Sequence, residues 1–363
     1  MRLNPNQPLG EEFLSAVQGY LDDFISTQRD LLTPTGRHLD MIWDHVSRLV
    51  RGGKRMRPAF CYWGYVAAAG LTQDPPKALI EIAASLDLLH LFALVHDDLI
   101  DESDTRRGQP ATHRFFEDFH NQQDWQGAGE PFGRSAAILL GDLLFAWSVS
   151  MAELAPLSPE RMKRARPYLD AMRIEVLAGQ MLDLVIQEKP LRTEELLGDA
   201  RLVIEYKTAK YTVARPVQIG AALGLASEAT LQSLGQFGAH VGNAFQMRDD
   251  LLGIFGDPVL TGKPSGDDLR QGKKTVLIAY AMSRANVEDQ AQLLGWLGKP
   301  DISADELDQA RQIMIGCGAV EETEKAILTQ ATAAMKLLHR LDLSAEGVEA
   351  LMTLVHAAVE RVA

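Results

Sequence analysis

The chain has 363 residues, of which 46% are hydrophobic, so it can bury one large core or two ordinary ones. Its 49 acidic and 36 basic residues give a formal net charge of -13, which argues against nucleic acid as a partner because duplex binding needs a basic face. Two cysteines are too few for a disulfide framework, so a reducing cytoplasm is the expected compartment. We expect neither a secretion signal nor a membrane span, because the N-terminus lacks an apolar core and Asp142 interrupts the longest apolar stretch, 135–152.

Apolar residues recur at three- and four-residue spacing along most of the chain, which predicts one helix after another. No alternating β-branched runs separate these segments, so strands are not expected. Polar, glycine-rich stretches at 108–133 and 256–274 should be loops, the first with a short helix near 114–120. We therefore predict an all-α fold in one domain spanning 1–363. The main expected helices cover 11–32, 37–50, 59–71, 76–101, 134–155, 193–225 and 227–255, and another begins at 158–159.

A cluster of carboxylates ends one apolar helix, in the segment LVHDDLIDESDTRR. Asp97 and Asp101 are four residues apart and would project from one helix face, with Asp98 beside them. Carboxylates at the rim of a buried apolar wall favour a cation. Mg²⁺ commonly bridges one or two carboxylates to substrate phosphates, and Arg106 and Arg107 offer forked donors for phosphate oxygens. The segment predicts a site for a metal ion and a diphosphate.

A second carboxylate pair, Asp249 and Asp250, lies near the C-terminal end of another apolar helix, in FQMRDDLLG. A single acidic pair at a helix end is as often a solvated surface as a site. Two pairs, each at the polar end of an apolar helix and each followed by basic residues, favour a shared function. If the two helices face each other, the carboxylates would lie on both sides of one cavity mouth, with room for several Mg²⁺ ions.

The motifs, in their order and spacing, resemble those of trans-isoprenyl diphosphate synthases, the polyprenyl synthetase family. The resemblance covers nearly the whole chain, through GGKRMRP, HLFALVHDDLIDESDTRRG, GQMLDL, YKTAK, FQMRDD and GKPSGDDLRQGKKT. It implies a single large helical bundle around a deep central cavity, usually built as a homodimer. It also implies head-to-tail joining of isopentenyl diphosphate to an allylic diphosphate.

The resemblance assigns roles at the allylic diphosphate, whose C–O bond ionises once metal ions and cations neutralise the leaving group. The expected metal ligands are Asp97, Asp101 and Asp249, holding three Mg²⁺ ions, with Asp98 and Asp250 in support. The other matched residues are Arg106, Lys207, Lys263 and Lys273 as cations, Thr208 and Gln246 beside the reacting carbon, and Gln180 and Asp183 on a helix facing the metal ions.

Isopentenyl diphosphate needs a second anion pocket that holds no metal ion. Lys54, Arg57, His90 and Arg107 match the family's residues there, as four potential cations from three segments. Alternatively, Lys54 and Arg55 could be surface charge, and a lone histidine on an apolar helix is more often part of a core. No side-chain base stands out, and in the family the departed diphosphate is the expected base for the last proton.

One position departs from the family's pattern. The second aspartate motif commonly ends in a third aspartate, where this chain has Gly253. Since Asp249 matches the main metal contact and Mg²⁺ often keeps several waters, we expect activity to persist with weaker metal binding on that side.

Three other classes of protein share part of this pattern. A class I terpene cyclase also has an aspartate-rich helix and Mg²⁺, but it needs no second diphosphate pocket, so Lys54, Arg57 and Arg107 argue against it. A non-catalytic partner subunit typically loses one aspartate motif, and this chain has both. A plain helical scaffold would leave the buried acids and the lysines unexplained.

Product length in the resembled family depends on residues just before the first aspartate motif. Ala93 lies about 6 Å below Asp97 on nearly the same helix face, and its small side chain leaves room for a growing chain. Phe92 lies roughly 140° around the helix from Asp97, so it could be ordinary core. One aromatic residue with a small neighbour is compatible with geranylgeranyl diphosphate (C20); farnesyl diphosphate (C15) is the alternative, and longer products rank third.

Overall fold

The computed structural model describes residues 3–70, 76–257 and 265–360, which form two compact units. The first unit comprises Met1–Leu169, Pro216–Leu231 and Leu343–Thr353, and the second comprises Asp170–Arg215, Gln232–Asp342 and Leu354–Ala363. Each unit is thus assembled from three stretches of chain. The predicted all-α fold is confirmed, whereas the single domain spanning 1–363 stays a prediction.

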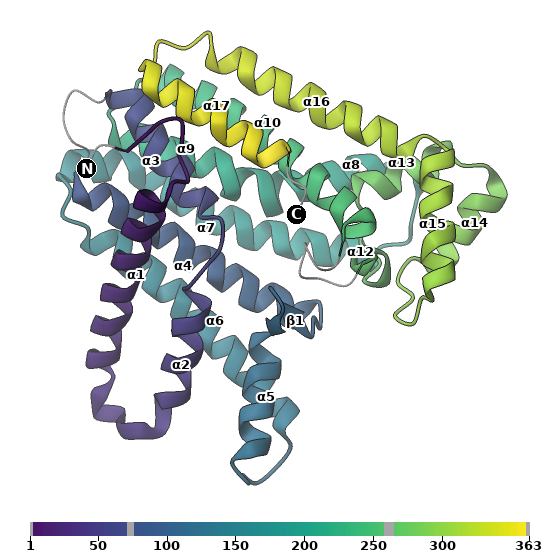
Figure 1. The fold of residues 1–363 in the computed structure, drawn as a ribbon, viewed down its shortest axis with the longest axis horizontal. Coiled ribbons are helices and arrows are strands. Elements are labelled where there is room, and N and C mark those ends of the chain that lie inside the picture. The colour runs from purple at the N-terminus through teal and green to yellow at the C-terminus, as the bar shows by residue number, and fades with distance from the viewer. Residues whose placement is uncertain (1–2, 71–75, 258–264, 361–363) are drawn as a thin grey trace. The chain divides into compact units, whose positions relative to one another are not determined.

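The first unit begins with a helical hairpin, in which α1 and α2 are joined by the short helix η1 (Figure 1). Gly36 adopts a left-handed φ of 66° inside η1, where the chain reverses. Two very short paired strands, β1 and β2, follow α4 and were not expected from the sequence. The elements are α1 (Glu11–Leu31), η1 (Thr33–Leu39), α2 (Asp40–Leu49), α3 (Met56–Ala69), α4 (Lys77–Ile100), β1 (Thr105–Arg106), β2 (Gln109–Pro110), α5 (Thr112–Gln122), α6 (Gly129–Leu154), the start of α7 (Pro159–Glu188), and most of α9 (Arg215–Leu223).

Helix α4 is the core of the first unit and packs against α1, α3 and α6. By length and composition both α4 and α6 could cross a membrane, but 78% of the apolar window of α4 is buried inside the protein, as in the core helix of a globular fold. The corresponding share for α6 is 44%, because side chains such as Leu139 and Leu154 are exposed.

The segment Leu343–Thr353, distant in sequence from the rest, completes the first unit. The Ser344 N–H donates a hydrogen bond of 2.9 Å to the Ala67 carbonyl oxygen, and its Oγ donates one of 2.8 Å to the Val66 carbonyl oxygen. A Cβ on Gly347 would lie 2.2 Å from the Ala67 Cα, so only glycine allows this approach. The start of α17 therefore lies directly against the last turn of α3.

The second unit is also helical, and a buried apolar cluster from α8, α10, α13, α15 and α16 forms its core. Ser303 and Glu306 form the predicted capping box at the start of α15. The elements are the rest of α7, α8 (Thr193–Val203), η2 (Ile204–Ala214), most of α10 (Glu228–Phe255), α12 (Asp267–Arg270), α13 (Val276–Arg284), α14 (Val287–Trp296), α15 (Ala304–Gly316), α16 (Ala319–Leu338) and the end of α17 (Ala345–Val359).

The helix expected at 193–225 is divided into three parts. Residues 204–214 form η2, a π-helix of 11 residues between α8 and α9. Long π-helices are rare, and shorter ones often mark functional sites.

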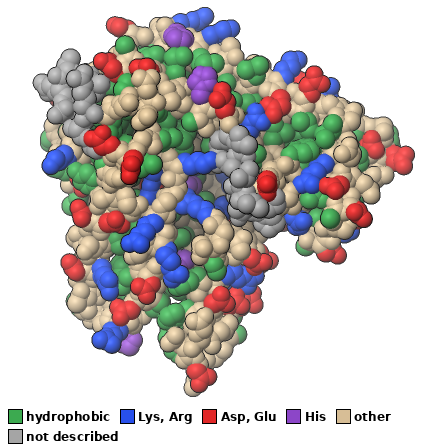
Figure 2. All heavy atoms as spheres, in the orientation of Figure 1, with side chains coloured by type: hydrophobic (Ala, Val, Ile, Leu, Met, Phe, Trp, Pro, Cys, Tyr) green, Lys and Arg blue, Asp and Glu red, His purple; other side chains and the backbone are tan. Residues whose placement is uncertain are grey.

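On the face that Figure 2 draws, acidic and basic side chains are interspersed with hydrophobic ones.

Candidate functional site

The first aspartate motif lies where α4 ends. Asp97 and Asp98 belong to its last turn, and Asp101 is its C-cap residue, whose N–H donates to the Asp97 carbonyl oxygen. The two neighbouring carboxylates differ in exposure: the Asp97 side chain is 18% exposed, and the Asp98 side chain only 4%. Asp97 and Asp101, both partly exposed, are therefore the carboxylates that a ligand can reach from solvent.

Arg106 holds the buried carboxylate of this motif. Its Nε donates to both oxygens of Asp98 at 2.8 and 3.0 Å, and its Nη2 also contacts Asp98 Oδ1. The same Nη2 lies 3.7 Å from Asp97 Oδ2. Burial opposes the charge of Arg106, but the hydrogen bonds and charge of Asp98, with the charges of Asp97 and Asp101, raise its pKa above the ordinary value. Arg106 is thus a permanent cation within the carboxylate cluster.

The basic loop before α3 lies beside Arg107. Gly52 and Gly53 have φ of 83° and 87°, a conformation that suits glycine. A Cβ on Gly53 would lie 3.0 Å from Arg107 Nη2, so the guanidinium group covers this glycine. Lys54 follows and is exposed. The structure therefore brings the loop and Arg107 together within the first unit.

His90 is surrounded by guanidinium groups. Burial and then the charges of Arg57, Arg107, Arg106 and Arg55, in that order, hold the pKa of His90 well below its ordinary value. A pKa lowered in this way favours the neutral imidazole over the fourth cation that the sequence suggested. His90 can still donate one hydrogen bond to an anion bound among these arginines.

Arg55 is not surface charge, so the alternative interpretation was wrong for this residue, whereas Lys54 is exposed. Arg55 is a buried residue with φ of 49°, and its side chain forms an ion pair with the buried Asp87. It also donates to Gln18 Oε1 at 2.7 Å and to the Val50 carbonyl oxygen. Burial and the charge of Arg107 lower its pKa to about 10. Arg55 fixes the loop that carries Lys54.

The two proposed chain-length residues have different surroundings. Phe92 is buried, and its ring packs at 5.1 Å from the Phe145 ring of α6 and at 4.8 Å from the His96 ring, both edge to face. Ala93 is partly exposed. Phe92 is thus a packed residue of the α4–α6 contact, as its position around the helix suggested.

In the second unit, η2 is flanked by polar partners on two helices. The Lys207 Nζ donates to Asp183 Oδ2 of α7 at 2.6 Å. The Thr208 Oγ1 donates to Gln246 Oε1 of α10 at 2.7 Å, and Gln246 Nε2 donates to Asp250 Oδ1 at 2.8 Å. Consecutive residues of η2 therefore contact different helices, and a hydrogen-bonded chain leads to the second aspartate motif.

This motif repeats the asymmetry of the first: Asp249 is exposed and Asp250 is buried. Burial and then the charge of Asp268, followed by that of Asp249, raise the pKa of Asp250 well above its ordinary value, against the Gln246 hydrogen bond and the Lys273 charge. Where the family's pattern has a third aspartate, a Cβ on Gly253 would lie 2.2 Å from Asp268 Oδ2. A carboxylate from α12 therefore lies beside the glycine.

Two adjacent lysines after α12 have separate surroundings. The Lys274 Nζ donates to three backbone carbonyl oxygens near the C-terminal end of α7, those of Ile186, Gln187 and Lys189, at 2.6–3.1 Å. Lys273 instead contributes positive charge near Asp250. Lys263, the remaining expected cation, lies outside the described residues.

Magnesium fits these residues. Among the described residues, no group of three or more His, Cys, Asp or Glu side chains is arranged to hold a metal ion. Mg²⁺ usually takes one or two carboxylates together with substrate phosphates and waters, and the accessible Asp97, Asp101 and Asp249 are carboxylates of that kind. In addition, the buried Asp250 Oδ2 has no hydrogen-bond partner in the described part of the chain, and a cation beside it would satisfy that oxygen.

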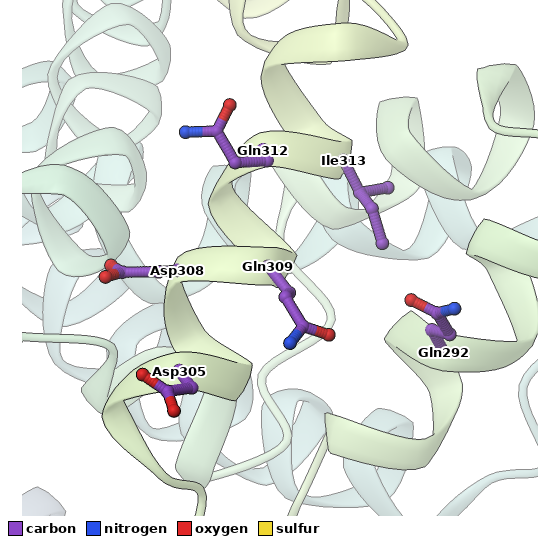
Figure 3. A pocket seen from close by; sticks show the side chains of 6 residues that line it. All are labelled: Gln292, Asp305, Asp308, Gln309, Gln312 and Ile313. Atoms are coloured by element: carbon purple, nitrogen blue, oxygen red, sulfur yellow. The ribbon is translucent and has the colours of Figure 1, made fainter.

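A hollow of about 470 Å³ elsewhere in the second unit is less suited to a diphosphate (Figure 3). Asp305 and Asp308 of α15 give its lining negative charge, which disfavours a diphosphate. Its lining residues are Gln292, Asp305, Asp308, Gln309, Gln312 and Ile313.

Comparison with known proteins gives consistent matches over most of the chain. A model of the polyprenyl synthetase family matches residues 40–314. Geranylfarnesyl diphosphate synthase of Aeropyrum pernix is 33% identical over 350 residues, covering 95% of this chain and 99% of that protein. (2E,6E)-farnesyl diphosphate synthase of Mycobacterium tuberculosis is 31% identical, with 92% and 91% covered.

A solved structure is similar in both fold and sequence. It is geranylgeranyl pyrophosphate synthase from Corynebacterium glutamicum, complexed with isoprenyl diphosphate and magnesium. The TM-score is 0.91 at 36% sequence identity, and the match covers 97% of this chain and 99% of that one.

Proposed function

The chain belongs to the polyprenyl synthetase family of prenyltransferases, and from this premise we propose that it makes geranylgeranyl diphosphate. The reaction joins isopentenyl diphosphate head to tail with dimethylallyl, geranyl and farnesyl diphosphates in turn. The observation that carries this proposal is the shared design of the two aspartate motifs. In each, the first carboxylate is accessible and the second is buried, and cationic side chains lie near both.

The accessible carboxylates Asp97, Asp101 and Asp249 would hold three Mg²⁺ ions, and these would neutralise the leaving diphosphate. Asp98 acts through Arg106, whose orientation it fixes with the bidentate contact. Lys207 and Lys273 add positive charge in the second unit, and Lys263 completes this set of cations. Their shared task is to bind the diphosphate through the moment at which the C–O bond breaks.

Thr208 and Gln246 lie next to the developing allylic cation in this proposal. Because the Thr208 hydroxyl donates its proton to Gln246 Oε1, its oxygen lone pairs can face positive charge. Gln246 is itself oriented by its bond to Asp250. The dipoles are therefore set before the charge develops, which lowers the barrier without reorganisation.

Isopentenyl diphosphate binds among Lys54, Arg57 and Arg107, with neutral His90 as a hydrogen-bond donor. Three observations support this pocket: the contact of Arg107 with Gly53, the charges around His90, and the buried anchor Arg55. No metal ion is needed there, because this diphosphate does not leave. The diphosphate released from the allylic substrate takes the final proton.

The small, partly exposed Ala93 supports a C20 product, and C15 is the second candidate. The relatives carry the names of three different products. The residues that limit product length therefore have to be identified in this chain itself. In this proposal Phe92 supports the position of α4 by packing on Phe145 of α6.

We also propose a cytoplasmic homodimer. On α6, Ile138, Leu139 and Leu154 are 47%, 65% and 67% exposed. In the second unit, α7 exposes Ile174, Leu177, Met181, Leu184 and Val185, which fall on one side at helical spacing. Exposed apolar stripes of this kind favour a protein partner, and a second copy is the partner that the family implies.

The test is to incubate the pure protein with Mg²⁺, isopentenyl diphosphate and each allylic diphosphate, and to identify the dephosphorylated products by chromatography. We expect a C20 alcohol. Asp97→Ala and Asp249→Ala should abolish turnover with the helical circular dichroism unchanged. Asp104→Ala, which removes an exposed carboxylate paired with Arg114, is the control and should stay active. A cyclic hydrocarbon product would favour the terpene cyclase, and full activity in either motif variant would overturn the proposal.

A further inference from the structure

The π-helix η2 lies unusually close to its two neighbours in the second unit. A Cβ on Gly179 of α7 would lie 2.4 Å from the Lys207 backbone nitrogen and 2.5 Å from the Tyr206 carbonyl carbon. A Cβ on Gly242 of α10 would lie 2.3 Å from the Ala209 Cα. These neighbours are backbone or near-backbone atoms that cannot rotate away, so any side chain at either glycine would displace η2.

Each glycine lies one helical turn before the polar residue that η2 contacts. Gly179 precedes Asp183, the partner of Lys207, by four residues on α7, and Gly242 precedes Gln246 by four residues on α10. Residues four apart lie on the same helix face. On each helix, therefore, a glycine lies against the η2 backbone, and one turn later a polar side chain forms a hydrogen bond with an η2 side chain.

A third turn of α7 continues this face. Glu175, four residues before Gly179, accepts two hydrogen bonds from Arg215 at 2.6 and 2.7 Å, and it lies 3.6 Å from Lys210 Nζ. Lys210 therefore joins η2 to α7.

We propose that Gly179 and Gly242 are positioning residues, which hold η2 close enough to α7 and α10 for Lys207 and Thr208 to reach their places at the reacting diphosphate and carbon. This inference rests on the proposed function. The glycines touch no substrate and act through the backbone of η2. Because a displacement of about 1 Å can cost a hundredfold in rate, a single methyl group at either position should slow ionisation.

The experiment compares Gly179→Ala and Gly242→Ala with Gly198→Ala, a matched control in α8 whose Cβ would meet nothing within 4 Å. We expect kcat to fall 10- to 100-fold in the first two variants. The KM for isopentenyl diphosphate should stay within twofold, because Lys54, Arg57 and Arg107 belong to the first unit. Gly198→Ala should keep both constants.

A gentler variant approaches the same contact from η2. Ala209→Ser adds one atom to the residue that faces Gly242. It should lower kcat and leave the KM for isopentenyl diphosphate unchanged, and it keeps the test available if Gly242→Ala does not fold.

The outcomes separate the two proposals. A wild-type protein that makes no prenyl diphosphate would overturn the proposed function. If the wild type is active but folded Gly179→Ala, Gly242→Ala and Ala209→Ser variants keep the wild-type kcat, the positioning role is refuted. An equal loss of kcat in Gly198→Ala would also refute it, since any methyl group on a helix would then have the same effect.

Discussion

Removal of the buried guanidinium group of Arg55 should destabilise the first unit strongly. The Arg55 and Asp87 side chains are only 3% and 7% exposed, so Arg55→Met would leave the Asp87 carboxylate buried without its cation. Breaking a buried pair on one side typically costs about 3–5 kcal/mol. Because native proteins are stable by only about 5–15 kcal/mol, urea denaturation followed by circular dichroism will detect this loss.

Two further variants test the reasoning. In Arg55→Met/Asp87→Leu both charges are gone, and most of the lost stability should return, since replacing a whole buried pair with apolar residues is often neutral. Arg114→Met breaks the pairs of a 36% exposed arginine with Asp104 and Glu117, whose side chains are 76% and 24% exposed, and should cost less than about 1 kcal/mol. If Arg55→Met costs no more than Arg114→Met, or if the double variant is as unstable as the single one, the ion pair does not stabilise the fold as argued.

Three other outcomes are expected. Lys54→Ala should raise the KM for isopentenyl diphosphate about tenfold with kcat nearly unchanged, and a selective rise for the allylic substrate would mean that the pockets are reversed. Ala93→Phe should shift the product from C20 toward C15 in chromatography. An unchanged product would show that Ala93 does not limit product length. Burial and the charge of Arg48 lower the pKa of His45 from 6.5 to about 3, so unfolding takes up a proton below pH 6.5. Stability should therefore fall by about 2 kcal/mol between pH 7 and pH 5, and His45→Gln should lack this part of the fall.

Helix positions followed from the sequence because burial of an apolar stripe decides them. The helix expected at 76–101 is α4, Lys77–Ile100, and the capping box at Ser303 fixed the start of α15. The π-helix could not be predicted this way, since apolar spacing does not distinguish an i→i+4 turn from an i→i+5 turn. Its signals are Gly179 and Gly242, which lie on other helices and are informative only once the packing is known.

Sequence reasoning groups candidate residues well where they lie within one short motif, and less well where their surroundings depend on distant partners. Arg55 could be taken as surface charge because its partner Asp87 is 32 residues away. A single aspartate inside the apolar run ASLDLLHLFAL was the available signal. The pKa of His90 is lowered first by burial and then by four arginines from two separate segments, and a count of charged residue types reveals neither cause.

The closure of the first unit by Ser344 has a consequence for how the protein is made. The Ser344 Oγ bonds to a carbonyl 278 positions earlier in the chain, at the end of α3. At about 5–20 residues per second, a ribosome needs roughly 15–55 s to synthesise the intervening chain. During that interval α3 has emerged with its last turn uncovered, and the first unit has to wait for a segment made 278 residues later. A nascent chain stalled before residue 343 should therefore expose this apolar surface to chaperones, because Leu343–Thr353 has not yet joined the first unit.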